Sequence, residues 1–279
     1  MRELHVDTIA AAVRDLAIEA NCELGDDVIA ALRRAVEEEE SPTGREILND
    51  LLENARIARE ERMPICQDTG LAVVFVEIGQ EVHLVGGALS GAIEEGVRRG
   101  YRDGYLRMST CHPFTRENRG DNTPAIIHYE IVSGEGLRIT FVPKGGGSEN
   151  MSRGIVLTPA EGVEGVRDFV IATVRDAGAK PCPPTIVGVG IGGTFEMAAL
   201  LAKRAILRPL GSINPDPELA ALETEWLRAV NRLGIGPQGL GGRITSLAVH
   251  IKSMPCHIAS LPVAVNMQCH AARAREVEL

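Results

Sequence analysis

The hydrophobic pattern of this 279-residue chain changes its period once, near Pro64, and this change limits the folds that the chain can adopt. Before it, apolar residues recur at the three- and four-residue spacing of amphipathic helices, as in Ile9, Val13 and Leu16. After it, period-two or continuous apolar runs predict strands, with helical patterns between them. We therefore expect a mixed α/β fold, in which a helical N-terminal segment (residues 1–60) precedes an α/β core (residues 61–279), together forming one integrated domain.

The individual elements follow from the same patterns. A third N-terminal helix is expected to start at a capping box of Thr43 and Glu46 and to run to about Glu60. A left-handed residue at Gly178 is expected to end another helix. Strands are predicted at residues 71–79, 81–85, 125–132, 137–143, 185–194, 243–252 and 262–267, and helices at 90–104, 159–177, 195–207 and 216–233.

Composition excludes several classes of partner. The net charge of −9 argues against nucleic-acid binding, which requires a basic surface. Every apolar run is interrupted by charges, Gly or Pro before it reaches the length of a membrane span, and the charged N-terminus lacks the pattern of a signal peptide. Six cysteines without an export signal are typical of a reducing compartment, so we expect a cytoplasmic protein with no membrane partner.

Three cysteines stand in unusual local sequences: Cys66 in MPICQDTG, Cys182 in AKPCPPT and Cys269 in NMQCHAAR. Pro, Gly or polar residues surround each one, and only folding could bring the three together. Three thiolates at one point would suit an iron–sulfur cluster that leaves one iron open for substrate, because electron-transfer clusters usually have four Cys ligands. For each cysteine alone, ordinary packing in a turn remains the alternative.

The other cysteines carry weaker signals. Cys256 and Cys269 are each followed by a histidine, which suggests a zinc site, but their spacing matches no compact zinc motif. The histidines, His257 and His270, are more often surface or hydrogen-bonded residues than ligands. Cys22 is expected to be inert packing, and Cys111 has only a modest functional signal.

Several segments offer groups that could bind an anionic substrate. Pro64 and Gly70 bound a shaped loop that carries Gln67 and Asp68 beside Cys66. The stretch VPKGGGSEN exposes backbone N–H groups around Gly146 that can form a nest for a carboxylate. Arg107 is a candidate for bidentate binding of a carboxylate.

Two further glycine-rich stretches have a structural interpretation. GVGIGG (residues 188–193) lacks the register of a dinucleotide-binding loop, so a close approach of its backbone to a ligand or a helix is the better interpretation. GIGPQGLGGRITS (residues 234–246) is too rich in glycine for a regular element and is expected to form another close backbone contact.

Taken together, these segments resemble the α-subunit, or cluster-binding part, of class I fumarate hydratases and L-tartrate dehydratases. The resemblance covers roughly residues 60–275. It rests on six stretches in the family's order: MPICQDTG, STCHPFTRENRGDNTPA, VPKGGGSEN, KPCPPTIVGVGIGGT, GPQGLGG and LPVAVNMQCHAAR.

The resemblance implies a 4Fe–4S cluster held by Cys66, Cys182 and Cys269, and contacts to a dicarboxylate from Gln67, Asp68, Arg107 and the backbone at Gly146. It also implies a separate β subunit carrying the rest of the active site, in an α2β2 heterotetramer. Asp68 would act as a catalytic acid or base, the sequence leaving open which.

The activity expected on this basis is that of a hydro-lyase, active only with its β subunit, which interconverts fumarate and (S)-malate as in the tricarboxylic acid cycle. Two alternatives remain open: an L-tartrate dehydratase subunit, and a non-catalytic metal-binding or electron-transfer partner. An isolated zinc-thiolate fold is a further possibility that metal analysis would test.

Overall fold

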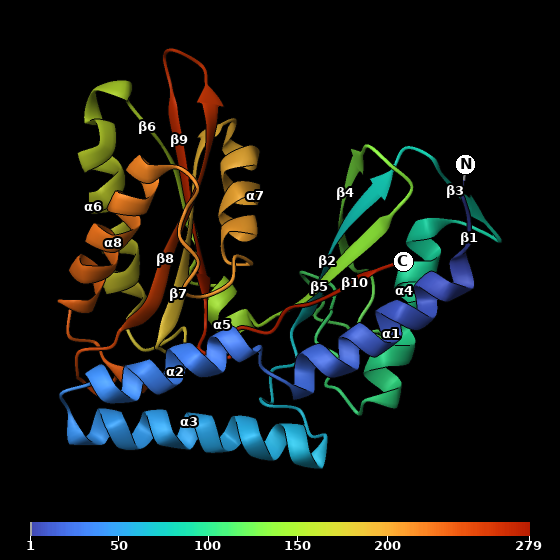
Figure 1. Ribbon diagram of the computed structural model, residues 1–279, viewed down its shortest axis with the longest axis horizontal. Helices are drawn as coiled ribbons and strands as arrows, with labels where there is room; N and C mark the ends of the chain where they lie inside the picture. Colours follow the sequence, from blue (N-terminus) through green and yellow to red (C-terminus); the bar gives the residue numbers. More distant parts are fainter. Residues whose placement is uncertain (1) are drawn as a thin grey trace. The chain divides into compact units, whose positions relative to one another are not determined.

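The computed structural model describes residues 2–279 and divides the chain into two compact units. Unit 1 consists of Met1–Leu24, Ala55–Gly146 and Arg273–Leu279, and unit 2 of Gly25–Asn54 and Gly147–Ala272. Both units combine helices with a mixed sheet, which confirms the α/β fold class (Figure 1). The boundary expected at residue 60 does not coincide with the division into these units, and the single integrated domain stays a prediction.

The sheet of unit 1 has the order β10-β5-β2-β4. Its central strand β2 (Leu71–Gly79) runs parallel to β4 (Ile126–Val132) and antiparallel to β5 (Leu137–Lys144), which pairs in turn with β10 (Arg275–Glu278). Alternate residues of β5, Leu137, Ile139 and Phe141, are fully buried, as expected for a strand with one face in a core. The predicted strands at residues 71–79, 125–132 and 137–143 are thus confirmed within a residue.

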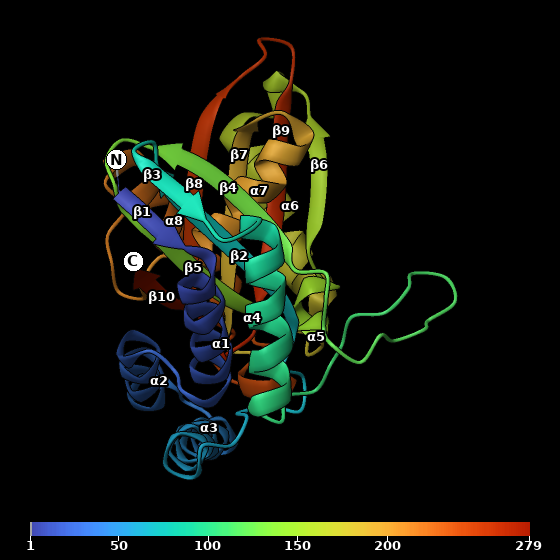
Figure 2. The same cartoon turned by 90° about the vertical axis from the view of Figure 1, so that its right-hand side faces the viewer.

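Helices α1 (Val6–Cys22) and α4 (Leu89–Asp103) complete the core of unit 1 and lie against each other (Figure 2). Two glycines in α4 explain how closely they approach. A Cβ atom at Gly96 would lie 2.6 Å from the carbonyl oxygen of Ala10, and one at Gly100 would lie 2.7 Å from the Cβ of Ala17. Any larger residue there would push the two helices apart.

The same unit contains a two-stranded parallel sheet of β1 (Arg2–His5) and β3 (Val82–Val85). A long loop without regular helix or strand joins α4 to β4 (Figure 2). Within this loop, Cys111 and Asn118 form one isolated antiparallel β-bridge. The sequence correctly predicted β3, whereas the start of the chain was expected to be helical and instead forms β1.

The sheet of unit 2 has the order β6-β9-β7-β8. Figure 1 shows α6 and α8 on one face of this sheet and α7 on the other. The sole tryptophan, Trp226, belongs to α8 and is fully buried in the core that this helix and α6 form with the sheet. The elements are α2 (Asp26–Glu38), α5 (Gly146–Glu149), β6 (Arg153–Leu157), α6 (Gly162–Ala177), β7 (Thr185–Gly193), α7 (Phe195–Ala205), α8 (Pro217–Asn231), β8 (Ser246–Cys256) and β9 (Leu261–Gln268), with 3-10 turns at Pro159–Glu161 and Pro237–Gly239.

The GVGIGG stretch of β7 is explained by helix packing. A Cβ atom at Gly188 would lie 2.3 Å from the carbonyl oxygen of Ala202, and one at Gly190 would lie 2.0 Å from that of Ala198. Both glycines therefore let α7 lie directly on the strand, which confirms the structural interpretation of this stretch as a close approach to a helix.

One predicted helix start is wrong and one predicted helix end is confirmed. Helix α3 begins at Pro42 and runs to Glu61, with the Ser41 hydroxyl, rather than a Thr43–Glu46 capping box, accepting the N–H of Gly44 at 3.2 Å. Proline is favoured at the first helical position because its missing N–H would be unsatisfied there in any case. Gly178 ends α6 with a positive φ of +55°, as expected, but its ψ of −130° is not that of the predicted left-handed helical conformation. Among residues 2–279, no helix is both long and apolar enough to cross a bilayer.

Candidate functional site

The loop that precedes β2 carries three of the predicted site residues in unit 1. Cys66 is partly exposed, and its Sγ atom accepts the backbone N–H of Asp68 at 3.4 Å and lies 3.4 Å from Oε1 of Gln67. Gly70 has φ +75°, and a Cβ there would lie 2.7 Å from the backbone of Lys144. The loop therefore depends on a backbone conformation and a close contact at position 70 that only glycine can adopt without strain.

Asp68 and Gly146, both expected to contact the substrate, lie together in unit 1. One carboxylate oxygen of Asp68 accepts the N–H of Gly70 at 3.0 Å, and the other accepts the N–H of Gly146 at 2.7 Å. A Cβ at Gly145 would lie only 3.2 Å from this second oxygen. The first glycines of the GGG stretch thus leave room for the Asp68 carboxylate, which occupies one N–H of the expected anion nest.

Buried side chains hold the backbone of the loop at residues 66–70 by hydrogen bonds to its carbonyl oxygens. The Tyr101 hydroxyl donates to the carbonyl oxygens of Thr69 and Gly70, at 2.7 and 3.0 Å, and Asn122 donates to that of Gly70 at 3.2 Å. Burial strongly raises the pKa of Tyr101, so its hydroxyl keeps the proton that it donates. The role of neither residue was predicted, although Asn122 lies in the motif STCHPFTRENRGDNTPA, because the sequence does not show which distant backbone groups a side chain will meet.

Arg107 lies beside the same loop. Its carbonyl oxygen accepts a hydrogen bond from the Thr69 hydroxyl at 2.6 Å, whereas its side chain is exposed. No hydrogen bond or ion pair involves its guanidinium among residues 2–279. An unpaired, exposed guanidinium is available to bind a carboxylate.

In unit 2 the structure brings together the segments that carry Cys182 and Cys269. The carbonyl oxygen of Cys182 accepts the N–H of His270 at 3.3 Å and lies 3.1 Å from the Nδ1 atom of the same residue. Cys182 is exposed and has φ +55°, and Cys269 directly follows β9 and is partly exposed. His270, expected to be a hydrogen-bonded residue rather than a ligand, joins the two segments.

The GPQGLGG loop holds these segments in place. Both the backbone N–H and the side-chain amide of Gln238 donate to the carbonyl oxygen of Pro183 at 2.8 Å, and the amide lies 3.2 Å from Nδ1 of His270. Gly239 approaches so closely that a Cβ would lie 2.2 Å from that of Ala179. The expected close backbone contact is therefore confirmed, and it fixes the geometry next to Cys182.

A buried carboxylate from the N-terminal part of the chain supports this loop. Glu39 accepts the N–H groups of Arg243 at 2.9 Å and Ile244 at 2.7 Å. Burial opposes ionisation of Glu39, but these backbone hydrogen bonds outweigh it and lower its pKa. The sequence offered no signal for this role, because Glu39 belongs to an ordinary run of acidic residues.

The SEN end of the glycine stretch is anchored to β9 just before Cys269. Glu149 forms an ion pair with Lys203 and accepts the amide N–H of Asn266 at 2.9 Å. The Ser152 hydroxyl accepts the N–H of Met267 at 3.0 Å. These contacts hold the strand end that presents Cys269.

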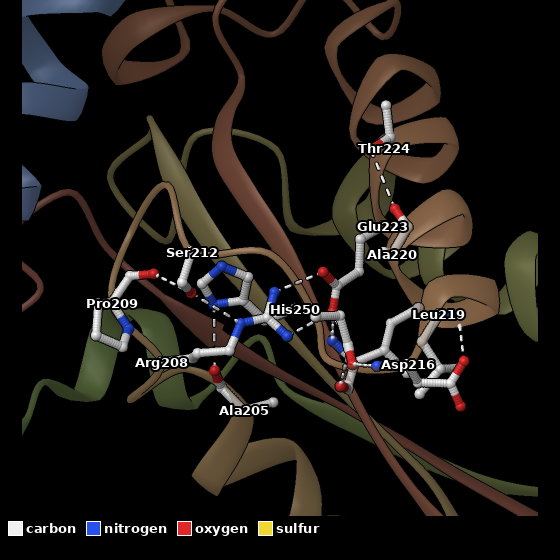
Figure 3. A network of polar contacts seen from close by, with 12 residues as sticks. Ala205, Arg208, Pro209, Ser212, Asp216, Leu219, Ala220, Glu223, Thr224 and His250 are labelled. Atoms are coloured by element: carbon white, nitrogen blue, oxygen red, sulfur yellow. Dashed lines mark hydrogen bonds and ion pairs between the residues drawn. The ribbon is translucent and has the colours of Figure 1, made fainter.

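A different polar network lies inside unit 2, away from the cysteine-bearing segments in sequence (Figure 3). Arg208 donates two hydrogen bonds to Glu223, which also accepts from Asn214 and from the N–H of Ile251, both at 2.7 Å. Burial alone would raise the pKa of Glu223, but these hydrogen bonds hold it below its usual value. Burial first, and then the charge of Arg208, lower the pKa of the neighbouring His250 to about 4.

The predicted cluster ligands fit a soft metal in their donor chemistry. None of the six cysteines of residues 2–279 forms a disulfide, and Cys66, Cys182 and Cys269 are all partly or fully exposed on loops or strand ends. By contrast, burial raises the pKa of the Cys22 thiol at the end of α1, which disfavours a ligating thiolate there.

The geometry itself provides no metal centre. Across residues 2–279, no three His, Cys, Asp or Glu side chains are grouped so that they could hold a metal ion. Cys66 belongs to unit 1, and Cys182 and Cys269 belong to unit 2. The three-cysteine ligand set therefore stays a prediction, as do the substrate contacts.

Comparison with known proteins places these observations in context. The sequence matches the family described as "Fumarate hydratase (Fumerase)" over residues 10–278. It is 44% identical over 271 residues to a Methanocaldococcus jannaschii protein provisionally named L(+)-tartrate dehydratase subunit alpha, with 95% of each chain covered. It is 37% identical over 252 residues to the L(+)-tartrate dehydratase subunit alpha of Escherichia coli K12 and to that of Shigella sonnei, which covers 89% of this chain and 83% of each relative. These names denote hydro-lyases, the class of activity that the comparisons support for the chain.

Proposed function

We propose that this chain, which belongs to the fumarate hydratase family, is the alpha subunit of an iron–sulfur hydro-lyase that interconverts fumarate and (S)-malate. The observation that carries the proposal is the loop at residues 66–70. It combines a partly exposed thiol and an Asp68 carboxylate oriented by two backbone N–H groups, and the backbone of Arg107, whose exposed guanidinium is unpaired, is hydrogen-bonded to it. A metal-dependent hydro-lyase acting on a dicarboxylate uses these three kinds of group: a metal ligand, a proton-transfer group and a carboxylate-binding cation.

In this proposal Arg107 binds one substrate carboxylate, because guanidinium forms bidentate hydrogen bonds with carboxylates. Gln67, which is exposed beside Cys66, adds a further contact from this subunit. Gly146, expected to bind the substrate, acts in this proposal through Asp68, whose carboxylate already accepts its N–H. Holding both ends of a four-carbon diacid fixes the reacting carbons relative to Asp68, and such orientation supplies a large part of enzymatic rate enhancement.

Asp68 is the proposed proton-transfer group. Its two oxygens are held by Gly70 and Gly146, so the carboxylate keeps one orientation toward a bound substrate. Hydration of a double bond needs one group that gives a proton and one that takes it. The complementary group is assigned to the partner subunit.

Cys66, Cys182 and Cys269 are the proposed ligands of a 4Fe–4S cluster. Bound through three thiolates, such a cluster supplies an iron with an open position that acts as a Lewis acid toward substrate oxygens. Around these ligands, Gln238, His270 and Glu149 hold the backbone of the two cysteine segments of unit 2.

The names of the relatives support the proposed partner. All three tartrate dehydratase relatives quoted above are named as alpha subunits, which supports a separate beta subunit for this chain. An α2β2 assembly in the cytoplasm, with a small dicarboxylate as the substrate, completes the proposal. A non-catalytic electron-transfer role gains no support, since the matched family and the relatives are named as hydro-lyases.

L(+)-tartrate is the second candidate substrate, favoured by the names of the relatives that match most of the chain. The deciding experiment is anaerobic co-expression with the neighbouring reading frame, followed by assays with fumarate, (S)-malate and both tartrate enantiomers. Hydration of fumarate with little turnover of tartrate supports the first proposal, and the reverse result supports the second. Turnover by this chain without a partner would contradict the divided active site.

A further inference from the structure

Arg273 is an almost completely buried arginine in unit 1, with 3% of its surface exposed. One of its terminal nitrogens donates to Oδ1 of Asn21 at 3.2 Å, and the other donates to the carbonyl oxygen of Asp68 at 2.8 Å. Its Nε atom is buried without a hydrogen-bond partner. No carboxylate of residues 2–279 forms an ion pair with it.

Such an arrangement is unfavourable for stability. A buried charge without a counter-ion carries a large desolvation penalty that no opposite charge offsets. An orphaned N–H group adds to that cost. Arg273 therefore needs an explanation other than its contribution to the free energy of unfolding.

The partners of Arg273 supply one. Asn21, which it contacts, also accepts the backbone N–H of Ile65 at 2.9 Å, directly before Cys66. Together with Tyr101 and Asn122, Arg273 binds the three consecutive carbonyl oxygens of residues 68, 69 and 70. The peptide planes of the loop are thus held from the buried side.

Holding the carbonyl of Asp68 also restricts its side chain. The carboxylate reaches the N–H groups of Gly70 and Gly146 only while the peptide group of Asp68 keeps its present orientation. We infer that Arg273 is a positioning residue, whose buried guanidinium fixes the loop so that the Asp68 carboxylate stays in its reactive orientation. This inference rests on the proposed function for the role of Asp68, but its structural part does not.

The test compares Arg273→Lys and Arg273→Gln with Arg275→Lys in the full chain, purified together with its partner subunit. Lysine keeps the charge and loses the planar fork, and glutamine loses the charge. Arg275 is the matched control, because it lies two residues further along and pairs with Glu23 rather than with the loop.

Hydrogen exchange gives a readout that needs no substrate or cluster. The amides of Gly70 and Gly146 report directly on the Asp68 carboxylate, and in both Arg273 variants they should exchange about tenfold faster or more. The amide of Ile139 in β5 should keep its protection, as should all three amides in Arg275→Lys. Unchanged exchange at Gly70 and Gly146 would overturn the inference even in an active enzyme.

Kinetics test the link to catalysis. In Arg273→Lys, kcat should fall about 10- to 100-fold with KM changed less than about threefold, because orientation is lost and binding is not. In the double variant with Asp68→Asn, the Arg273→Lys change should lower kcat by less than about threefold relative to Asp68→Asn alone, because both changes act through the Asp68 carboxylate. Additive losses, or failure of both Arg273 variants to fold, would make Arg273 a purely structural residue. If no dicarboxylate is turned over at all, the exchange result still decides, and only the proposed function fails.

Discussion

Arg208 in unit 2 and Arg273 in unit 1 are both largely buried, but Arg208 faces a carboxylate and Arg273 faces none. Glu223 binds Arg208 through both oxygens, and the remaining acceptor capacity is used by Asn214 and Ile251. Arg273 instead donates to the carbonyl oxygen of Asp68 and to the side chain of Asn21, and its Nε atom has no hydrogen-bond partner.

The difference separates two uses of a buried cation. A network in which every charge is paired holds helices and strands of one core together, and it is sensitive to the loss of one partner. A cation that is left without a counter-ion contributes orientation at a cost in stability. Variants in the paired network should therefore change unfolding, whereas variants around the site loop should change cluster binding or turnover.

The largest effect is expected for the cysteines. Replacing Cys66, Cys182 or Cys269 by Ser should abolish the visible absorbance of the cluster in anaerobically purified protein, because each removes one of three thiolate ligands. Cys22→Ser and Cys256→Ser are the controls and should keep it. A full complement of iron in Cys269→Ser would remove that residue from the ligand set.

Asp68→Asn should come next. It keeps the shape of the side chain and removes its ability to exchange a proton, so kcat should fall about 10²- to 10⁴-fold with the cluster retained. The midpoint of urea unfolding should fall less than in variants of the Arg208 network, because Asn loses one of the two N–H groups that Asp68 accepts but leaves no buried charge unpaired. Near-normal turnover would exclude Asp68 from catalysis.

Glu223→Gln tests the paired network itself. It leaves Arg208 buried without its counter-ion, which typically costs about 3–5 kcal/mol of unfolding free energy. Urea denaturation of the variant measures the loss, and Glu225→Gln on the same helix is the control, because the Glu225 side chain is 57% exposed. Equal stabilities of the two variants would show that the Arg208–Glu223 pair does not stabilise the fold.

The lowered pKa of His250 predicts how the stability of unit 2 depends on pH. Its pKa is about 4 in the folded chain and near 6.5 when unfolded, so between these values the unfolded chain binds more protons. Stability should thus fall by up to about 3 kcal/mol as the pH drops from 6.5 toward 4. Urea midpoints across this range should fall less steeply for His250→Gln than for the unmodified chain, and identical slopes would contradict the assignment.

The smallest effect is expected for Arg107→Lys at the site loop. It keeps the charge and loses bidentate geometry, so KM should rise about tenfold with kcat reduced less. Arg102→Lys is the control, because that exposed side chain pairs with its neighbour Asp103. A KM equal to that of the control would show that Arg107 does not bind the substrate carboxylate.

Much of the fold was predictable, since periodicity marks elements that bury one face. The strands of β2, β4, β5, β7 and β9 and the helices α4, α6, α7 and α8 lie close to the expected ranges. Short edge elements were missed: β1, β6 and β10 are only four or five residues long. Such strands carry too few residues to show a period, and they exist because a neighbouring strand offers hydrogen bonds.

The candidate site was predictable to the extent that its residues stand in distinctive local sequences. Asp68 and Gly146, both expected to contact the substrate, lie together, although Gly146 donates its N–H to Asp68 and not to an open nest. The structural roles of Tyr101, Gln238 and Arg273 were not predicted. The local sequence around a tyrosine, glutamine or arginine does not indicate which residue far away in the chain it will contact. Their roles depend on contacts that only the folded chain creates.

The sequence by itself determined the α/β class, the shaped loop around Cys66 and Asp68, and the family, because periodicity, Pro and Gly restrict the backbone locally. The tertiary structure alone decided which buried side chains hold that loop and which buried cation goes without a counter-ion. Hydrogen bonds are short and directional, so residues that meet from positions 21, 68 and 273 can be recognised only once packing has placed them within about 3 Å of one another.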